Sequence, residues 1–311
     1  MSKLIFHVGW PHSGSSFHQE HIFPNIDSLN YLGTPFISHE VRDLLNKICF
    51  LDDSTFDFDY NKKIALSIGE RASKSVSPSL ISFETIVATS GEPLALETIQ
   101  GRTFIAERLS KLFGELKIIF TIRSQLDALE SHYGIILKSY LRQRIKYMSF
   151  SDFVEWNLSK EFSGPLGLFQ YYPIINYYKN LFGPINVRVL IYEQLQVDRE
   201  AYFRSLFDFC EIDWSSNILA FANKRSNERI AARTHTYEKV RSHFPRDLKF
   251  GKFLPEDIKK AFMQFIYNGT RAKFDSSLVS DLIADYYSAS NSALAQEFGL
   301  ELREYGYPMD S

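Results

Sequence analysis

The chain has 311 residues, 45% of them hydrophobic, and a formal net charge of −2 at pH 7. This size suits one large α/β domain, and the absence of a basic excess argues against a nucleic-acid partner. Cys49 and Cys210 lie far apart without metal-ligand spacing, which favours reduced thiols in a cytosolic protein. We find no secretory signal and no apolar run long enough to span a bilayer, so we expect a cytoplasmic protein without a membrane span.

The first turn of the chain has the pattern of an anion-binding loop. Lys3 to Val8 reads as a buried strand, a Gly/Pro/Ser loop follows, and a helix opens at Ser15 or Ser16. The first N–H groups of a helix have no partners inside it, and the helix dipole favours negative charge there. Gly9, Gly14 and Ser16 fit the phosphate-loop template G-x-x-x-x-G-K-[ST], but Ser15 holds the lysine position. That lysine holds the phosphates in nucleoside triphosphatases, so we expect a phosphate-type loop that does not serve an NTPase.

Alternating strands and helices predict the fold class. We expect an α/β fold with a central parallel sheet flanked by helices and a helical C-terminal part, in a single domain over residues 1–311. The predicted strands are Lys3–Val8, Lys63–Ile68, Leu116–Ile122 and Asn186–Tyr192, and no strand is expected after Ser215. The main predicted helices are Ser38–Phe50, Gly101–Phe113, Gln125–Lys146, Ser151–Lys160, Leu168–Phe182, Arg199–Cys210, Glu256–Lys273 and Ser276–Glu297; a further helix is considered near Leu80–Val87.

Ligands of a parallel sheet bind outside the carboxyl ends of its strands. The predicted strand ends deliver the glycine loop, Glu70, Arg123 and the pair Tyr192-Glu193 to one edge. Arg123 can grip a phosphate through its planar guanidinium, or it can be a structural arginine paired with a nearby carboxylate. The sequence shows neither a metal-ligand constellation nor a nucleophile–base pair, and His7 reads as a hydrogen-bonded core histidine.

The loop resembles the 5′-phosphosulfate loop of sulfotransferases that use 3′-phosphoadenosine 5′-phosphosulfate (PAPS). The usual run in that family is Pro-Lys-Thr-Gly-Thr-Thr, and here it is Pro11 to Ser16 with His12 in place of the lysine. The resemblance implies the P-loop-NTPase-like sulfotransferase fold, no metal, and a nucleotide donor held by His12, Ser13, Gly14, Ser15, Ser16 and Phe17. An arginine at a strand end and a serine eight residues later bind the 3′-phosphate in this family, and Arg123 and Ser131 match that spacing. Arg225, within Asn223–Asn227, resembles a loop that closes over the nucleotide.

Two residues are candidates for catalysis. By the resemblance, His12 stands where a lysine neutralises charge as the sulfuryl group leaves, so we expect it to bind as imidazolium beside the anion. The alternative is a degenerate loop that binds nucleotide without turnover. Glu70 is the candidate general base for the acceptor, and it resembles the Ser-x-Glu segment after the second strand of bacterial relatives, although the run here is Ser67 to Glu70. A solvated carboxylate, alone or paired with Arg71, is an equal alternative for Glu70.

The function that the resemblance implies is transfer of a sulfuryl group from PAPS to an acceptor hydroxyl or amine. The acceptor would be carried by a glycan, a glycolipid or a small molecule. Two alternatives stay open: a non-catalytic nucleotide-binding protein, motivated by His12, and a P-loop kinase or NTPase, which Ser15 and the lack of a clear acidic strand end for Mg²⁺ disfavour.

Overall fold

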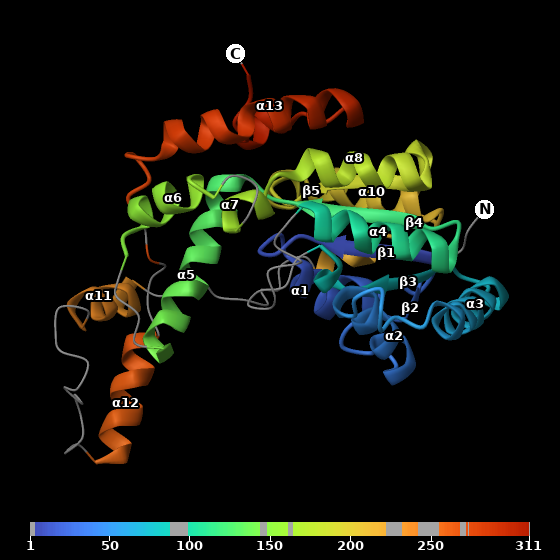
Figure 1. Ribbon diagram of the computed structural model, residues 1–311, viewed down its shortest axis with the longest axis horizontal. Helices are drawn as coiled ribbons and strands as arrows, with labels where there is room; N and C mark the ends of the chain where they lie inside the picture. Colours follow the sequence, from blue (N-terminus) through green and yellow to red (C-terminus); the bar gives the residue numbers. More distant parts are fainter. Residues whose placement is uncertain are drawn as a thin grey trace.

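A five-stranded parallel sheet forms the centre of the computed structural model, and helices flank it (Figure 1). The structure describes residues 4–87, 99–143, 148–160, 164–221, 232–241, 255–267, 272 and 274–310. The strand order is β2-β3-β1-β4-β5, and every neighbouring pair is parallel. The strands are β1 (Leu4–Gly9), β2 (Asn30–Tyr31), β3 (Ser79–Ser82), β4 (Lys117–Ile122) and β5 (Val187–Ile191). The predicted α/β class with a central parallel sheet is confirmed.

The helical segments occupy most of the remaining described residues. The α-helices are α1 (Ser15–Phe17), α2 (His39–Phe50), α3 (Phe58–Lys74), α4 (Ile99–Phe113), α5 (Gln125–Gln143), α6 (Phe150–Leu158), α7 (Pro165–Leu168), α8 (Tyr171–Phe182), α9 (Gln194–Val197), α10 (Arg199–Cys210), α11 (Ala232–Arg241), α12 (Glu256–Tyr267) and α13 (Ser280–Phe298). A π-helical turn, His18–Ile22, continues α1, and 3-10 turns span Phe23–Asn25, Glu84–Ile86, Pro184–Asn186, Ser216–Ala220 and Leu302–Tyr305.

Alternate residues of the central strands point into two separate apolar cores, as the period of two in a strand requires. From β1, Phe6 and Val8 enter the larger core with Phe120 of β4, while Ile5 enters the smaller core with Ile119. Helices α2, α3, α4 and α8 supply the larger core, and α10 with the helical turns after α1 supplies the smaller one. Both faces of the central strands are therefore covered, which is why these strands read as continuous apolar runs.

Local signals explain why several helices begin where they do. Ser38 caps α2, because its hydroxyl accepts a hydrogen bond from the N–H of Val41 at 3.3 Å. Val41, Leu44 and Ile48 are buried at helical spacing along the same element. The prediction for this helix is confirmed, and α10 has the bounds that the sequence predicts.

The predicted strand Lys63–Ile68 is wrong, because this segment is the middle of α3. The Asp57 carboxylate caps the helix at the N–H of Tyr60, and the buried positions follow helical rather than alternating spacing. The strand that pairs with β1 on the side away from β4 is β3, in the serine-rich stretch where the sequence analysis considers a helix near Leu80–Val87. That stretch contains β3 and one 3-10 turn instead.

The C-terminal part is helical, and after Ser215 the described residues contain no strand. Helix α13 packs along α8, and α11 and α12 form a pair beside α5 at one end of the molecule (Figure 1). None of the described helices has the length and apolarity that a membrane crossing requires.

Candidate functional site

The loop between β1 and α1 folds tightly at the carboxyl edge of the sheet. The Trp10 carbonyl accepts hydrogen bonds from the backbone N–H of Ser13 at 3.1 Å and from its hydroxyl at 2.5 Å. His12 and Gly14 both have left-handed backbones, with φ of 67° and 86°. The loop therefore ends with the chain turned into the first turn of α1, whose N–H groups a helix leaves without internal partners.

Two glycines are required by the packing of this loop. A Cβ at Gly9 would lie 2.1 Å from the Ser15 hydroxyl oxygen, and a Cβ at Gly14 would lie 2.5 Å from the Tyr192 ring. Gly14 also adopts a φ that favours glycine. The spacing Gly9 to Gly14 thus has a physical reason in this chain, and a backbone bare of side chains at these points suits the close approach of an anion.

Arg123 follows β4 and reaches across to the loop. Its guanidinium donates to the His12 carbonyl at 3.0 Å, and carboxylate oxygens of Asp127 and Glu193 lie 3.5 Å and 4.0 Å from it. Its Nε is buried and has no hydrogen-bond partner among the described residues. Arg123 therefore lies beside the loop, as phosphate binding requires, and it also has the carboxylate neighbours of a structural arginine.

His12 faces a second histidine that the sequence analysis did not single out. His12 Nε2 and His132 Nδ1 are 3.2 Å apart, and His132 comes directly after Ser131, which is half-buried on α5. Burial lowers the pKa of His12 to about 3, with His132 and then Arg123 as further causes. Burial also lowers the pKa of His132 to about 4. Without a bound anion both rings are therefore neutral at pH 7, which differs from the imidazolium expected for the bound state.

Glu70 does not lie at the edge of the sheet where it was expected. It is exposed on α3, and its neighbour Arg71 forms an ion pair with Glu40 of α2 rather than with Glu70. The expectation failed because it rested on the wrong strand. The two interpretations of Glu70 are a general base and a solvated carboxylate, and its exposed position on α3 agrees with the solvated carboxylate.

The carboxylate at the end of β3 is Glu84. It completes a Ser-x-Glu run that begins at Ser82, the last residue of the strand, and its carboxylate lies near the Ser15 hydroxyl. Burial raises the pKa of Glu84, and the nearby Ser15 hydroxyl opposes that rise. The sequence signal was the Ser82–Glu84 run itself, which becomes readable once β3 is placed.

A buried polar network lies beneath the loop. His18 Nδ1 is 2.9 Å from the Gly14 carbonyl and its Nε2 is 2.7 Å from the Tyr202 hydroxyl. His7 bonds Ser82 Oγ at 2.8 Å through Nδ1 and Thr121 Oγ1 at 2.9 Å through Nε2. The prediction that His7 is a hydrogen-bonded core histidine is confirmed. Burial lowers the pKa of His7 well below its ordinary value and that of His18 to about 4.

The structure thus brings together the loop Ser13–Phe17, His12 and Arg123, with Ser131 next to His132. Lys224 and Arg225 lie outside the described residues. Over the described ranges, no group of three or more His, Cys, Asp or Glu side chains could hold a metal ion. The binding roles of these residues stay predictions.

No family model matches the chain, and no curated protein matches it in sequence. Among solved structures, it is similar to a sulfotransferase from Alicyclobacillus acidocaldarius, with 12% identity, 98% of each chain covered and a TM-score of 0.47. It is also similar to the mouse sulfotransferase SULT7A1 complexed with PAP, with 14% identity, 98% of this chain and 86% of that chain covered and a TM-score of 0.39. A third is the sulfotransferase domain from the curacin biosynthetic pathway, with 14% identity, 86% of this chain and 98% of that chain covered and a TM-score of 0.35. Likeness at this level leaves the function to be argued from the residues of the site.

Proposed function

We propose that this chain is a sulfotransferase that moves a sulfuryl group from PAPS to an acceptor hydroxyl or amine on a glycan, a glycolipid or a small molecule. One observation supports this most strongly. A glycine loop at the end of β1 lies between the Glu84 carboxylate after β3, which is near the Ser15 hydroxyl, and Arg123 after β4, which donates a hydrogen bond to the His12 carbonyl. A general base, an anion-binding loop and a cation are the three groups that in-line transfer of an anionic group to an acceptor can use.

Each residue has a distinct task in this proposal. The N–H groups and hydroxyls of Ser13 to Phe17 would bind the 5′-phosphosulfate, and Arg123 with Ser131 would bind the 3′-phosphate. PAPS would supply the sulfuryl group. Glu84 replaces Glu70 as the proposed general base, because its burial favours the neutral acid and so makes the carboxylate more basic. It would accept the proton of the acceptor on a carboxylate oxygen.

Two alternatives rest on specific residues. Glu84 supplies the acidic strand end that the sequence analysis did not find, and this favours a kinase or NTPase that binds Mg²⁺. Against it, the lysine position of the loop is held by Ser15, a buried residue without the positive charge of lysine. His12 favours the second alternative, a protein that binds the nucleotide without transferring the group, because a neutral imidazole lacks the charge of lysine.

Calorimetric titration with 3′-phosphoadenosine 5′-phosphate (PAP), in parallel with ATP and Mg²⁺, tests the proposal. We expect micromolar PAP binding and weak ATP binding. Arg123→Ala should weaken PAP binding roughly 10- to 150-fold, the effect of losing a charge-assisted hydrogen bond of about 1.5–3 kcal/mol. Arg188→Ala is the control, since Arg188 is an exposed arginine on β5.

Turnover is then measured as PAP release from PAPS with a panel of acceptors. Glu84→Gln should abolish most turnover and leave PAP affinity nearly unchanged, while the matched change Glu70→Gln should alter neither. Preference for Mg-ATP would support the NTPase alternative. Tight PAP binding with no transfer to any acceptor would support the binding-protein alternative, and equal turnover in Glu84→Gln would remove Glu84 from the mechanism.

A further inference from the structure

We infer that His12 and His132 form one two-imidazole cation site, which takes up a single proton when the anionic nucleotide binds and so supplies the positive charge that a lysine would supply at position 12. His132 acts through His12 and is a positioning residue. This inference rests on the proposed function, since the ligand that drives the proton uptake is the nucleotide.

The geometry holds the two rings as a pair. His12 Nε2 and His132 Nδ1 are 3.2 Å apart, so one proton must lie between them. The ring centroids are 5.4 Å apart, and the Phe169 ring contacts both imidazoles, at 6.5 Å and 6.1 Å between centroids. The backbone of His12 is fixed as well, because Arg123 bonds its carbonyl at 3.0 Å.

The proton count of the pair defines what it can do. Two neutral imidazoles carry one N–H proton each, and one of these two protons lies in the hydrogen bond between the rings. Only one of the outer nitrogens, His12 Nδ1 or His132 Nε2, therefore carries the second. A third proton from solvent would fill the remaining outer nitrogen, so that both point a donor outward and the two rings share one positive charge. No bond other than N–H forms or breaks.

Burial first, and then the charges around the pair, explain why it is neutral before a ligand arrives. The Arg123 cation lies next to His12 and, after burial and His132, is a further cause of its lowered pKa. Asp127 and Glu193 flank Arg123, and burial followed by Asp127 raises the pKa of Glu130 on the same helix to about 7.

Other elements near the pair contribute little opposing charge. Phe169, between α7 and α8, is apolar, and Glu84, which follows β3, lies near the Ser15 hydroxyl. Helix α11 packs against α5 and carries two titratable residues, His235 and Lys239. The His235 ring contacts Phe274. An anion with several negative charges at the loop would outweigh Arg123 and favour the protonated pair.

A fixed lysine and a proton-loaded pair differ in a measurable way. If the free pair is neutral and the complex carries one proton, nucleotide affinity falls tenfold for each unit of rising pH, whereas a lysine gives no such slope from this position. The site would therefore bind its donor more tightly in mildly acidic conditions and release the product as pH rises.

The experiment is calorimetric titration of the full chain with PAP near pH 7.5, in three buffers of different ionisation enthalpy, which counts the protons taken up. We expect about one more proton per PAP in the wild type than in His12→Lys, where the charge is permanent. The phosphates of PAP titrate equally in both proteins and cancel in the difference. His132→Asn should lose most of this extra proton, and the exposed His39→Asn should keep it.

The outcomes separate the inference from the proposed function. If PAP binds and His12→Lys and wild type take up the same number of protons, the pair is not a cation site and the proposed function stands. If His132→Asn weakens binding but keeps the extra proton, His132 has only a structural role and the inference is overturned. If the wild type and His12→Lys both fail to bind PAP, the proposed function fails and the inference falls with it.

Discussion

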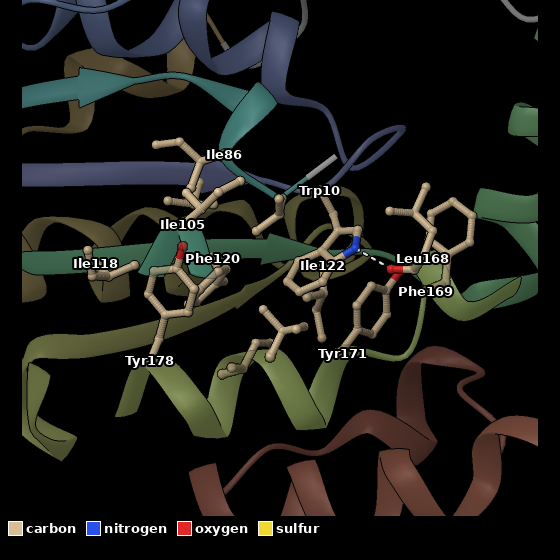
Figure 2. Close-up of a cluster of buried hydrophobic side chains, with 14 of the residues drawn as sticks. Trp10, Ile86, Ile105, Ile118, Phe120, Ile122, Leu168, Phe169, Tyr171 and Tyr178 are labelled. Carbon is tan, nitrogen blue, oxygen red and sulfur yellow. Dashed lines mark hydrogen bonds between the residues drawn. The ribbon is translucent and has the colours of Figure 1, made fainter. Parts of the chain in front are cut away.

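The two faces of the sheet support the loop in different ways. On the larger core, Trp10 packs against Phe120 and Tyr171, and its indole N–H donates to the Leu168 carbonyl at 2.7 Å (Figure 2). On the smaller core, His7 and His18 are fully buried and linked by hydrogen bonds to strands, helix and loop. The larger core is held by apolar packing, whereas the smaller core combines apolar packing with a network of satisfied polar groups beneath the loop. We call these sides the apolar face and the polar face.

The difference shows which interactions can tune the loop. Apolar packing contributes to stability in proportion to buried area and has little directional preference. The hydrogen bond from His18 to the Gly14 carbonyl is directional and ends on the loop itself. Changes on the apolar face should therefore affect the whole fold, whereas changes on the polar face should affect both stability and ligand binding.

The largest expected effect is on the apolar face. Phe120→Ala should lower the free energy of unfolding by about 3–5 kcal/mol, because it leaves a cavity between Trp10 and Tyr178. Urea unfolding followed by circular dichroism measures this loss. Phe36→Ala, at a side chain that is 65% exposed, should stay within about 0.5 kcal/mol of the wild type. Equal effects at the two positions would contradict the packing described for this face.

Thr121→Val tests the polar face with nearly the same side-chain volume. It removes the hydroxyl that bonds His7 Nε2 at 2.9 Å and leaves a buried ring nitrogen without that partner. We expect a loss of about 1–3 kcal/mol in the free energy of unfolding. A variant as stable as the wild type in urea would mean that the His7 network contributes nothing to the fold.

Much of this architecture could be predicted from the sequence because its signals are local. Strands β1, β4 and β5 are apolar runs, the glycine loop has a template, and α2 begins at a serine cap. The strand β3 was missed because it has only two apolar residues, Leu80 and Ile81, within a serine-rich stretch. The segment Lys63–Ile68 of α3 resembles a strand for a different reason: a short apolar run has no clear period, so it cannot be assigned to a helix or a strand by periodicity.

The errors in the site follow from that misplaced strand and from tertiary contacts. Glu70 is the predicted base because it follows Lys63–Ile68, which is part of a helix and not a strand. Glu84 follows β3, which the sequence analysis does not predict. His12 and His132 are separated by 120 positions, and no local pattern shows that their rings meet. Their pairing depends on the packing of α5 beside the loop.

Acid should destabilise the folded protein through its buried histidines, two of which, His7 and His18, lie on the polar face. The pKa values of His7 and His18 are lowered in the folded protein, so the unfolded chain binds more protons as the pH falls below about 6.5. Stability is therefore fully present above that pH and is lost as the pH falls toward about 4, the pKa of His18. Each such histidine contributes up to about 1.4 kcal/mol per pH unit in this window.

Urea unfolding at several pH values between 7 and 5 checks this slope. Glu84 and Glu193, whose pKa values are raised, act with the opposite sign, so the comparison is made between variants. His18→Gln should reduce the slope by about one proton, and the exposed His39→Gln should leave it unchanged. An equal slope in His18→Gln and wild type would mean that His18 does not titrate with unfolding.

The smallest effect gives the sharpest comparison, because one hydroxyl is removed from each face. Tyr202→Phe removes the partner of His18 Nε2 and should lower the free energy of unfolding by about 1 kcal/mol. Tyr178→Phe removes a buried hydroxyl that has no hydrogen-bond partner among the described residues, so it should be neutral or stabilising. Chemical denaturation of the two variants measures both changes.

The same two variants also differ in their expected PAP binding. Because His18 also bonds the Gly14 carbonyl, Tyr202→Phe should weaken PAP binding a few-fold, while Tyr178→Phe should leave it intact. Equal losses of stability and of affinity in both variants would show that the two faces support the loop in the same way.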